Sequence, residues 1–119
     1  MAEGRRIGVL VPNLFLRVGV DAAVQASGAE VVGLAGPAAA AAAGCVAVIA
    51  DLDALGPDPA AAISALAAAG ATVLAFGPHV QGERLATARA AGAVVLPRSV
   101  FLHRLPELLA AVLGPGGES

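Results

Sequence analysis

Short runs of β-branched and aliphatic residues alternate along this chain with alanine-rich segments. The apolar runs lack a strict alternation of polar and apolar positions, which is typical of strands buried on both faces of a sheet. These runs are residues 7–11, 30–34, 46–50, 71–76 and 93–96. The segments between and after them are rich in alanine and leucine, the strongest helix formers. These segments are residues 14–27, 37–43, 59–69, 82–91 and 105–113. The pattern predicts five strands, each followed by a helix.

Glycine and proline mark the ends of the expected helices. A glycine follows each helical segment, at the position where a left-handed backbone ends a helix. These glycines are Gly28, Gly44, Gly70, Gly92 and Gly114. Proline is tolerated in a first helical turn, because its missing N–H would have no partner there. We therefore expect Pro37, Pro59 and Pro106 to lie in first turns, and Asp58 to cap the third helix.

Strands that alternate with helices predict a parallel sheet covered on both faces, and right-handed crossovers restrict its topology. We expect a doubly wound (βα)₅ sheet of the α/β class, in three layers and with the strand order 2-1-3-4-5. Residues 1–119 are expected to form a single domain with its core at about 6–113 and flexible ends at 1–4 and 115–119.

Composition and charge exclude several classes of protein. Hydrophobic residues make up 58% of the chain and charged residues 13%, which excludes intrinsic disorder. The net charge is −2, with arginine as the only basic residue besides histidine, so we expect no nucleic-acid binding. Cys45 is the one cysteine, which excludes an intrachain disulfide and a multi-thiolate metal site. A lone thiol agrees with a reducing compartment, and we expect a cytoplasmic protein.

A membrane span is not expected either. The longest uncharged run, residues 31–50, has about the length of a spanning helix. Glycine and proline interrupt this run, and its strongly apolar residues lie only at its two ends.

Three stretches together resemble the receiver domains of two-component response regulators. RIGVLV at 6–11, Leu16-Arg17 and ASGAEVV at 26–32 look like a receiver's first strand, first helix and second strand. VIADL at 48–52 looks like the end of the third strand, where receivers carry the phosphorylated aspartate. ARAAGA at 88–93 with VVLPRS at 94–99 looks like the fourth helix and fifth strand. The resemblance covers residues 6–113 and implies the receiver fold.

The chain departs from the receiver pattern at most of the positions that the resemblance assigns to phosphotransfer. Pro12 and Asn13 occupy the place of the acidic pair that holds Mg²⁺, which prefers carboxylate oxygens. Gly77 takes the place of the threonine or serine after the fourth strand. Arg98 and Ser99 take the places of the lysine and proline after the fifth strand. Asp51 alone is unchanged, so we expect no resident metal, and Mg²⁺ only if Asp51 is phosphorylated.

Polar residues gather at the expected carboxyl ends of the strands, where open parallel sheets place their sites. We expect these residues to converge on one rim of the sheet. They are Asn13, Asp51, Asp53, His79, Arg98 and Ser99. Asp51 is either a phosphoacceptor or a structural residue that pairs with Arg98 or caps backbone N–H groups. We expect the second role, with a bidentate Arg98 clamp whose atoms lie within about 4 Å of Asp51.

The expected helix at 82–91, the strand at 93–96 and the helix at 105–113 form an apolar face rimmed by Arg84, Arg89 and Arg104. The resemblance implies that this face binds a protein partner or a second copy. Ordinary solvated arginines are the alternative explanation of this rim.

No catalytic residue is assigned, because no nucleophile elbow surrounds Ser99 and no dinucleotide fingerprint or other cofactor motif is present. The sequence therefore predicts a non-catalytic signalling or regulatory module in which phosphorylation is absent or vestigial. A functional phosphoacceptor using Asp51 is one alternative. A flavodoxin-like anion binder or small enzyme, using the rim residues and the helix amino termini there, is the other.

Overall fold

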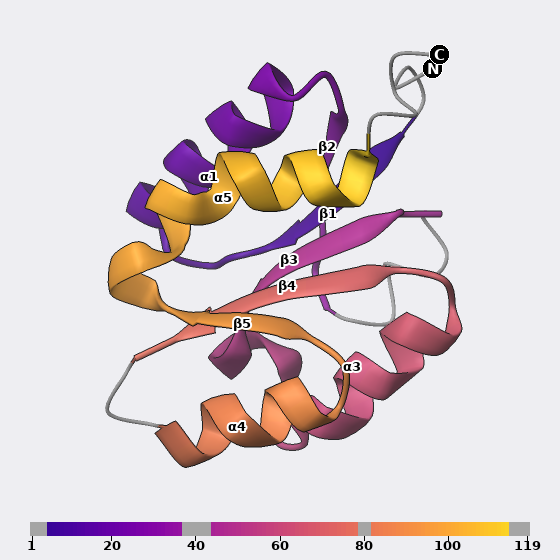
Figure 1. Ribbon diagram of the computed structural model, residues 1–119, viewed down its shortest axis with the longest axis vertical. Coiled ribbons are helices and arrows are strands. Elements are labelled where there is room, and N and C mark those ends of the chain that lie inside the picture. The colour runs from indigo at the N-terminus through magenta and orange to yellow at the C-terminus, as the bar shows by residue number, and fades with distance from the viewer. Residues whose placement is uncertain (1–4, 37–43, 79–81, 115–119) are drawn as a thin grey trace.

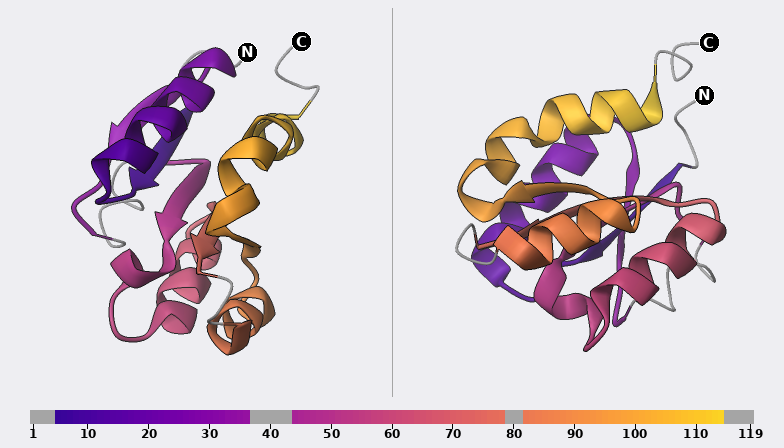
Figure 2. Two further views of the ribbon diagram at one scale, coloured as in Figure 1. Left: turned by 90° about the vertical axis from the view of Figure 1, so that its left-hand side faces the viewer. Right: turned by 60° about the horizontal axis from the view of Figure 1, so that its bottom comes forward.

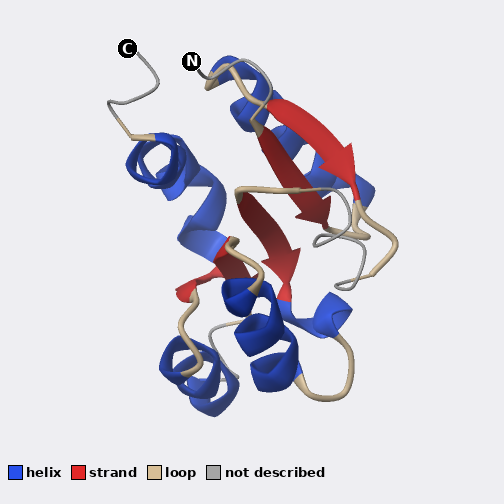
Figure 3. Ribbon diagram, turned by 90° about the vertical axis from the view of Figure 1, so that its right-hand side faces the viewer, coloured by secondary structure: helices blue, strands red, loops and turns tan. Residues whose placement is uncertain are grey.

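The computed structural model describes residues 5–36, 44–78 and 82–114, and in it five parallel strands form one sheet between two layers of helices (Figure 1). The strands are β1 (Arg6–Leu10), β2 (Glu30–Gly33), β3 (Ala47–Asp51), β4 (Thr72–Gly77) and β5 (Val94–Pro97). They pair in parallel in the order β2-β1-β3-β4-β5, and the strand arrows that are fully visible in Figure 3 point in a common direction. The predicted doubly wound topology is confirmed.

Helices cover both faces of this sheet. They are α1 (Leu14–Ala26), the 3₁₀ turn η1 (Leu52–Leu55), α3 (Pro59–Ala68), α4 (Gly82–Ala90) and α5 (Arg98–Leu113). Both views of Figure 2 separate α1 and α5, on one face, from α3 and α4, on the other. The expected helix at 37–43 lies outside the described residues. Within the described ranges, no helix is both long enough and apolar enough to cross a lipid bilayer.

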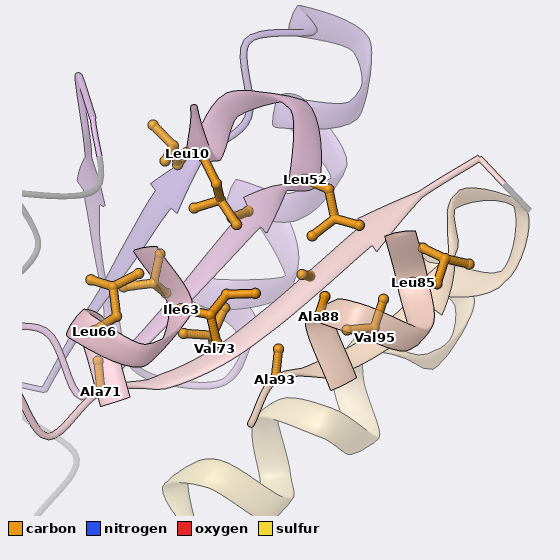
Figure 4. Packing of buried hydrophobic residues seen from close by; sticks show 14 of the residues in the cluster. Leu10, Leu52, Ile63, Leu66, Ala71, Val73, Leu85, Ala88, Ala93 and Val95 are labelled. Carbon is orange, nitrogen blue, oxygen red and sulfur yellow. The ribbon is translucent and has the colours of Figure 1, made fainter. Parts of the chain in front are cut away.

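Alternate residues of the strands feed two separate cores. In β3, Ala47 and Ile49 pack with the α1–α5 side, whereas Val48 and Ala50 pack with the α3–α4 side. All five residues of β3 are buried, as a central strand covered on both faces requires. Figure 4 shows the second core, in which Ile63 and Leu66 of α3 and Leu85 and Ala88 of α4 meet the sheet. This two-sided burial explains why the strands read as continuous apolar runs.

Local signals in the sequence start and end most of the elements. The side chain of Asp58 accepts a hydrogen bond from the Ala61 N–H and caps α3, as predicted. Gly28, Gly70 and Gly92 follow α1, α3 and α4 with φ angles of 89°, 94° and 112°. This left-handed backbone is costly for residues with a side chain, so the predicted helix ends are confirmed.

The last helix differs from its prediction. α5 begins at Arg98, directly after β5, and Pro106 lies inside it instead of in its first turn. A proline within a helix costs about 3 kcal/mol. Phe101, Leu105 and Leu109 recur every four residues and are buried, and each buried apolar side chain contributes about 1.5–3 kcal/mol. This apolar stripe outweighs the proline, which the local sequence pattern could not show.

Candidate functional site

The carboxyl ends of β1 and β3 present the first two predicted rim residues, and the two are used differently. Asn13 caps α1: its Oδ1 accepts hydrogen bonds from the backbone N–H groups of Phe15 at 2.9 Å and Leu16 at 3.1 Å. This is the ordinary role of asparagine at a helix start, since the first N–H groups of a helix have no internal partner. The Asn13 side chain is therefore part of the local structure of α1.

Asp51 ends β3 and is the one charged residue in the buried class among those that the structure describes, with 8% of its surface exposed. Its Oδ1 accepts a hydrogen bond from the Asp53 N–H at 3.0 Å, which caps η1. Its Oδ2 lies 3.6 Å from Nη2 of Arg98. The predicted proximity within 4 Å is confirmed. The bidentate clamp is wrong, because 3.6 Å is too long for a hydrogen bond and the contact is a looser ion pair.

Arg98 reaches Asp51 because α5 begins immediately after β5. The Arg98 Cζ lies 6.0 Å from the centre of the Phe76 ring, within the range of a cation–π contact. Phe76 of β4 in turn packs against Phe101 of α5, with ring centres 4.9 Å apart. The side chain of Arg98 is 43% exposed, whereas that of Asp51 is 11% exposed. An aromatic side chain of the core thus holds a half-exposed cation beside a nearly buried anion.

Two further predicted rim residues that the structure describes, Asp53 and Ser99, differ from this pair in their surroundings. Asp53 Oδ1 lies 2.6 Å from Nη1 of Arg84 in α4, and so its carboxylate is directed to the α3–α4 side. Ser99, the second residue of α5, is exposed. His79 lies outside the described residues.

The position that carries a hydroxyl in receivers is closely packed here. Gly77 ends β4 and is buried. A Cβ atom added to Gly77 would lie 3.2 Å from Leu52 Cδ1 and 3.2 Å from Leu85 Cδ2, which is closer than ordinary van der Waals contact. A threonine or serine would therefore require these leucines to move.

The residues at this rim do not fit Mg²⁺. The ion takes near-octahedral oxygen ligands and is usually held in proteins by carboxylates. Asp51 shares its carboxylate with Arg98 and a backbone N–H, and Asn13 is engaged as a cap. Across the described ranges, no three histidine, cysteine, aspartate or glutamate side chains gather as a metal site would need.

Two hollows lie beside the rim, and neither is lined by Asp51 or Arg98. One, of about 260 Å³, lies between η1, the start of α3 and α4 and is lined by residues that include Asp58, Glu83 and Arg84. The other, of about 360 Å³, lies at the ends of β1 and β2 and includes Pro12 and Arg17 in its walls. A third, smaller hollow has Arg98 in its wall, where the other lining residues, Phe76 and Phe101 among them, are apolar.

Two features of the surface were not predicted from the sequence. Leu14, Phe15 and Val18, at the start of α1, are 77%, 92% and 71% exposed. Their spacing on one helix face gives a signal, but only the fold shows that none of the described elements covers them. The arginines of the expected interaction face bond within the chain: Arg84 to Asp53, Arg89 to the Val95 carbonyl and Arg104 to Glu107.

Cys45 is buried at 7% exposure, as expected for a small apolar side chain. Burial raises the pKa of its thiol above the ordinary value, and Arg6 partly offsets this effect. A raised pKa leaves little of the reactive thiolate at neutral pH, so Cys45 is not a candidate nucleophile.

No protein-family model matches the chain, and no curated protein sequence matches it. Solved structures do. A response regulator from Thermotoga maritima superposes with a TM-score of 0.74 at 16% identity, over 92% of this chain and 97% of that one. HP1043, an orphan response regulator of H. pylori, gives 0.74 at 12% identity, over 96% and 100%.

NtrX from Brucella abortus, solved in complex with ADP, gives a TM-score of 0.73 at 19% identity over 91% of this chain, but over only 26% of its own. The matched region is therefore one part of a longer protein chain. Together with the strand order, these similarities show that the chain has the fold of response-regulator receiver domains.

Proposed function

We propose that this chain is a non-catalytic signalling or regulatory module of the receiver type, in which phosphorylation of Asp51 is absent or vestigial. The observation that carries the proposal is the state of the Asp51 carboxylate. One oxygen accepts the Asp53 N–H and the other faces Arg98. An arginine thus supplies positive charge next to this aspartate.

Phosphoryl transfer to a carboxylate needs cations that neutralise the charge on the transferred group. Arg98 is the nearby cation, and a guanidinium is a planar donor that cannot reproduce the geometry of a hexacoordinate ion. The neighbouring positions add no carboxylate at the end of β1 and no hydroxyl at the end of β4. The close packing of Gly77 against Leu52 and Leu85 supports the same conclusion.

The experiment is labelling by a small phosphodonor, such as acetyl phosphate, in the presence of Mg²⁺, followed by intact-mass spectrometry. We expect no added phosphoryl group on the wild-type protein under conditions that label an active receiver. Asp51→Ala is the site variant, and Asp58→Ala, which removes another carboxylate near the same rim, is its matched control. A stable Mg²⁺-dependent mass increase that Asp51→Ala abolishes and Asp58→Ala retains would overturn the proposal and establish a phosphoacceptor.

A module that catalyses no reaction acts by binding other molecules. We assign this binding to the face formed by α4, β5 and α5, with a second copy of the chain as the partner. Val94 on β5 and Val100 on α5 are 40% and 41% exposed, which leaves apolar surface on these two elements. Sedimentation velocity over a hundredfold range of concentration tests this assignment. Val94→Glu should shift a dimer to monomer, whereas Ala61→Glu, on the exposed side of α3, should not.

The anion-binding alternative gains no support from the rim. A ligand site would need a concave surface that exposes Arg98 and further polar donors such as the helix amino termini. The hollow with Arg98 in its wall is otherwise lined by apolar side chains, and the two larger hollows described above are lined by other residues. The ion pair with Asp51 also occupies the cation that an anion would use.

A further inference from the structure

β5 is an edge strand, because it pairs with β4 on one side only in the sheet order β2-β1-β3-β4-β5. An edge strand offers backbone N–H and C=O groups to any chain that can align beside it, and natural proteins block such edges in identifiable ways. This strand lies within the face proposed above for contacts. Whether its backbone is available therefore determines how that face can associate.

Backbone groups at the outer side of β5 are blocked at three successive positions. In a strand, alternate residues direct their backbone groups to the same side, so positions 93, 95 and 97 belong together. The Ala93 N–H donates to the Ala88 carbonyl at 3.2 Å, at the end of α4 and not to a strand. The Val95 carbonyl accepts two bonds from Arg89, from Nε at 3.2 Å and from Nη2 at 2.9 Å. Pro97 has no N–H to offer.

Arg89 reaches this carbonyl because the chain reverses immediately after α4. Arg89 lies in the last turn of α4, and Gly92, with φ of 112°, returns the chain into β5. Figure 4 shows the neighbouring Ala88 beside Val95 in the core, so the last turn of α4 lies directly against the strand. Arg89 follows Ala88 on the helix, and its guanidinium closes the edge from outside the core.

We propose that Arg89 protects the open edge of the sheet: by holding the Val95 carbonyl, it prevents a second chain from adding a strand to β5. Association through this side of the molecule is then restricted to side-chain contacts. The guanidinium fork suits this role because two of its donors converge on one acceptor. The proposal concerns the backbone of β5 and is independent of the chemistry of Asp51.

Arg89→Ala tests the proposal, with Arg17→Ala as the matched control. Arg17 is also a helical arginine with an intrachain partner, Asp21, but it lies on α1, outside the face formed by α4, β5 and α5, and both variants lose one positive charge. We expect Arg89→Ala to raise the apparent association constant for self-association at least tenfold in sedimentation equilibrium, and Arg17→Ala to leave it within twofold of the wild type. Far-ultraviolet circular dichroism confirms that each variant is folded.

Amide hydrogen exchange distinguishes strand addition from other association. The Val95 N–H lies on the same outer side as the Val95 carbonyl, so an added strand would protect it, whereas contacts between side chains would not. We expect protection of this amide to rise with the concentration of Arg89→Ala and to stay constant for Arg17→Ala. Arg89→Lys, which keeps the charge but loses the fork, should give an intermediate result. A folded Arg89→Ala that associates no more than the wild type, or that associates without protecting Val95, would overturn the proposal.

Discussion

Asp51 and Asp53 stand two residues apart, and each faces an arginine, yet the two pairs belong to different regions. The Asp53–Arg84 contact is the shorter, at 2.6 Å, but its side chains are 58% and 38% exposed. The Asp51–Arg98 contact is 3.6 Å, and the aspartate is 11% exposed. Water screens the first pair and solvates either partner when the other leaves. Water reaches the Asp51 carboxylate poorly. Loss of the longer pair should therefore cost more stability than loss of the shorter one.

Leu52 separates the two regions, since its side chain fills the space next to Gly77 that a larger residue would need. Gly77→Thr should cause the largest loss of stability, because the added atoms displace Leu52 and Leu85. Overpacking of this kind costs roughly 1–3 kcal/mol. Urea denaturation measures the loss, and Gly82→Ala, where an added Cβ meets no atom within 4 Å, is the control. Unchanged stability of Gly77→Thr would mean that the packing between the two regions is loose.

Arg98→Met should cause the second-largest loss of stability. The substitution keeps an apolar side chain near Phe76 but removes the ion-pair partner of the Asp51 carboxylate, whose hydrogen-bond donor among the described residues is the Asp53 N–H. An under-satisfied buried group costs about 1–3 kcal/mol of stability. Because the Arg98 side chain is half-exposed, we expect a loss near the lower end of this range. Thermal and urea unfolding measure the loss, and Asp51→Asn in the same background should recover part of it. A variant as stable as the wild type would show that the pair contributes nothing.

Asp53→Ala should cause the smallest loss of stability. Exposed ion pairs contribute about 0.2–1 kcal/mol, and less at high salt. We expect the stability of this variant to lie within about 1 kcal/mol of the wild type, with the difference decreasing between 0.05 M and 1 M sodium chloride. A larger loss that salt leaves unchanged would reverse the ranking of the two pairs.

Much of the fold was predictable because its signals are local. Alanine-rich segments between apolar runs predicted the alternation of strands and helices, and the glycines after α1, α3 and α4 were placed correctly. The start of α5 was not, because the stripe of Phe101, Leu105 and Leu109 is stabilised by burial against α1 and the sheet. A proline rule that considers one helix alone has no access to that energy.

The sequence predicted the location of the candidate site better than the contacts that its side chains make. The parallel sheet brings the ends of β3 and β5 together, which predicted that Asp51 would meet Arg98. Asn13 and Asp53 lie near the same rim, but a helix start and α4 compete for their side chains. The closure of the β5 edge by Arg89 gave no sequence signal, since a helical arginine followed by a glycine turn is common on protein surfaces.

Sequence by itself determined the class of the fold, the order of its elements and the identities of the groups at the rim, because backbone preference and apolar periodicity act over a few residues. Only the tertiary structure decided the polar partners that the sequence did not predict. That choice depends on distance and burial between packed elements, and it gave Arg84 to Asp53 and Arg89 to the backbone of β5.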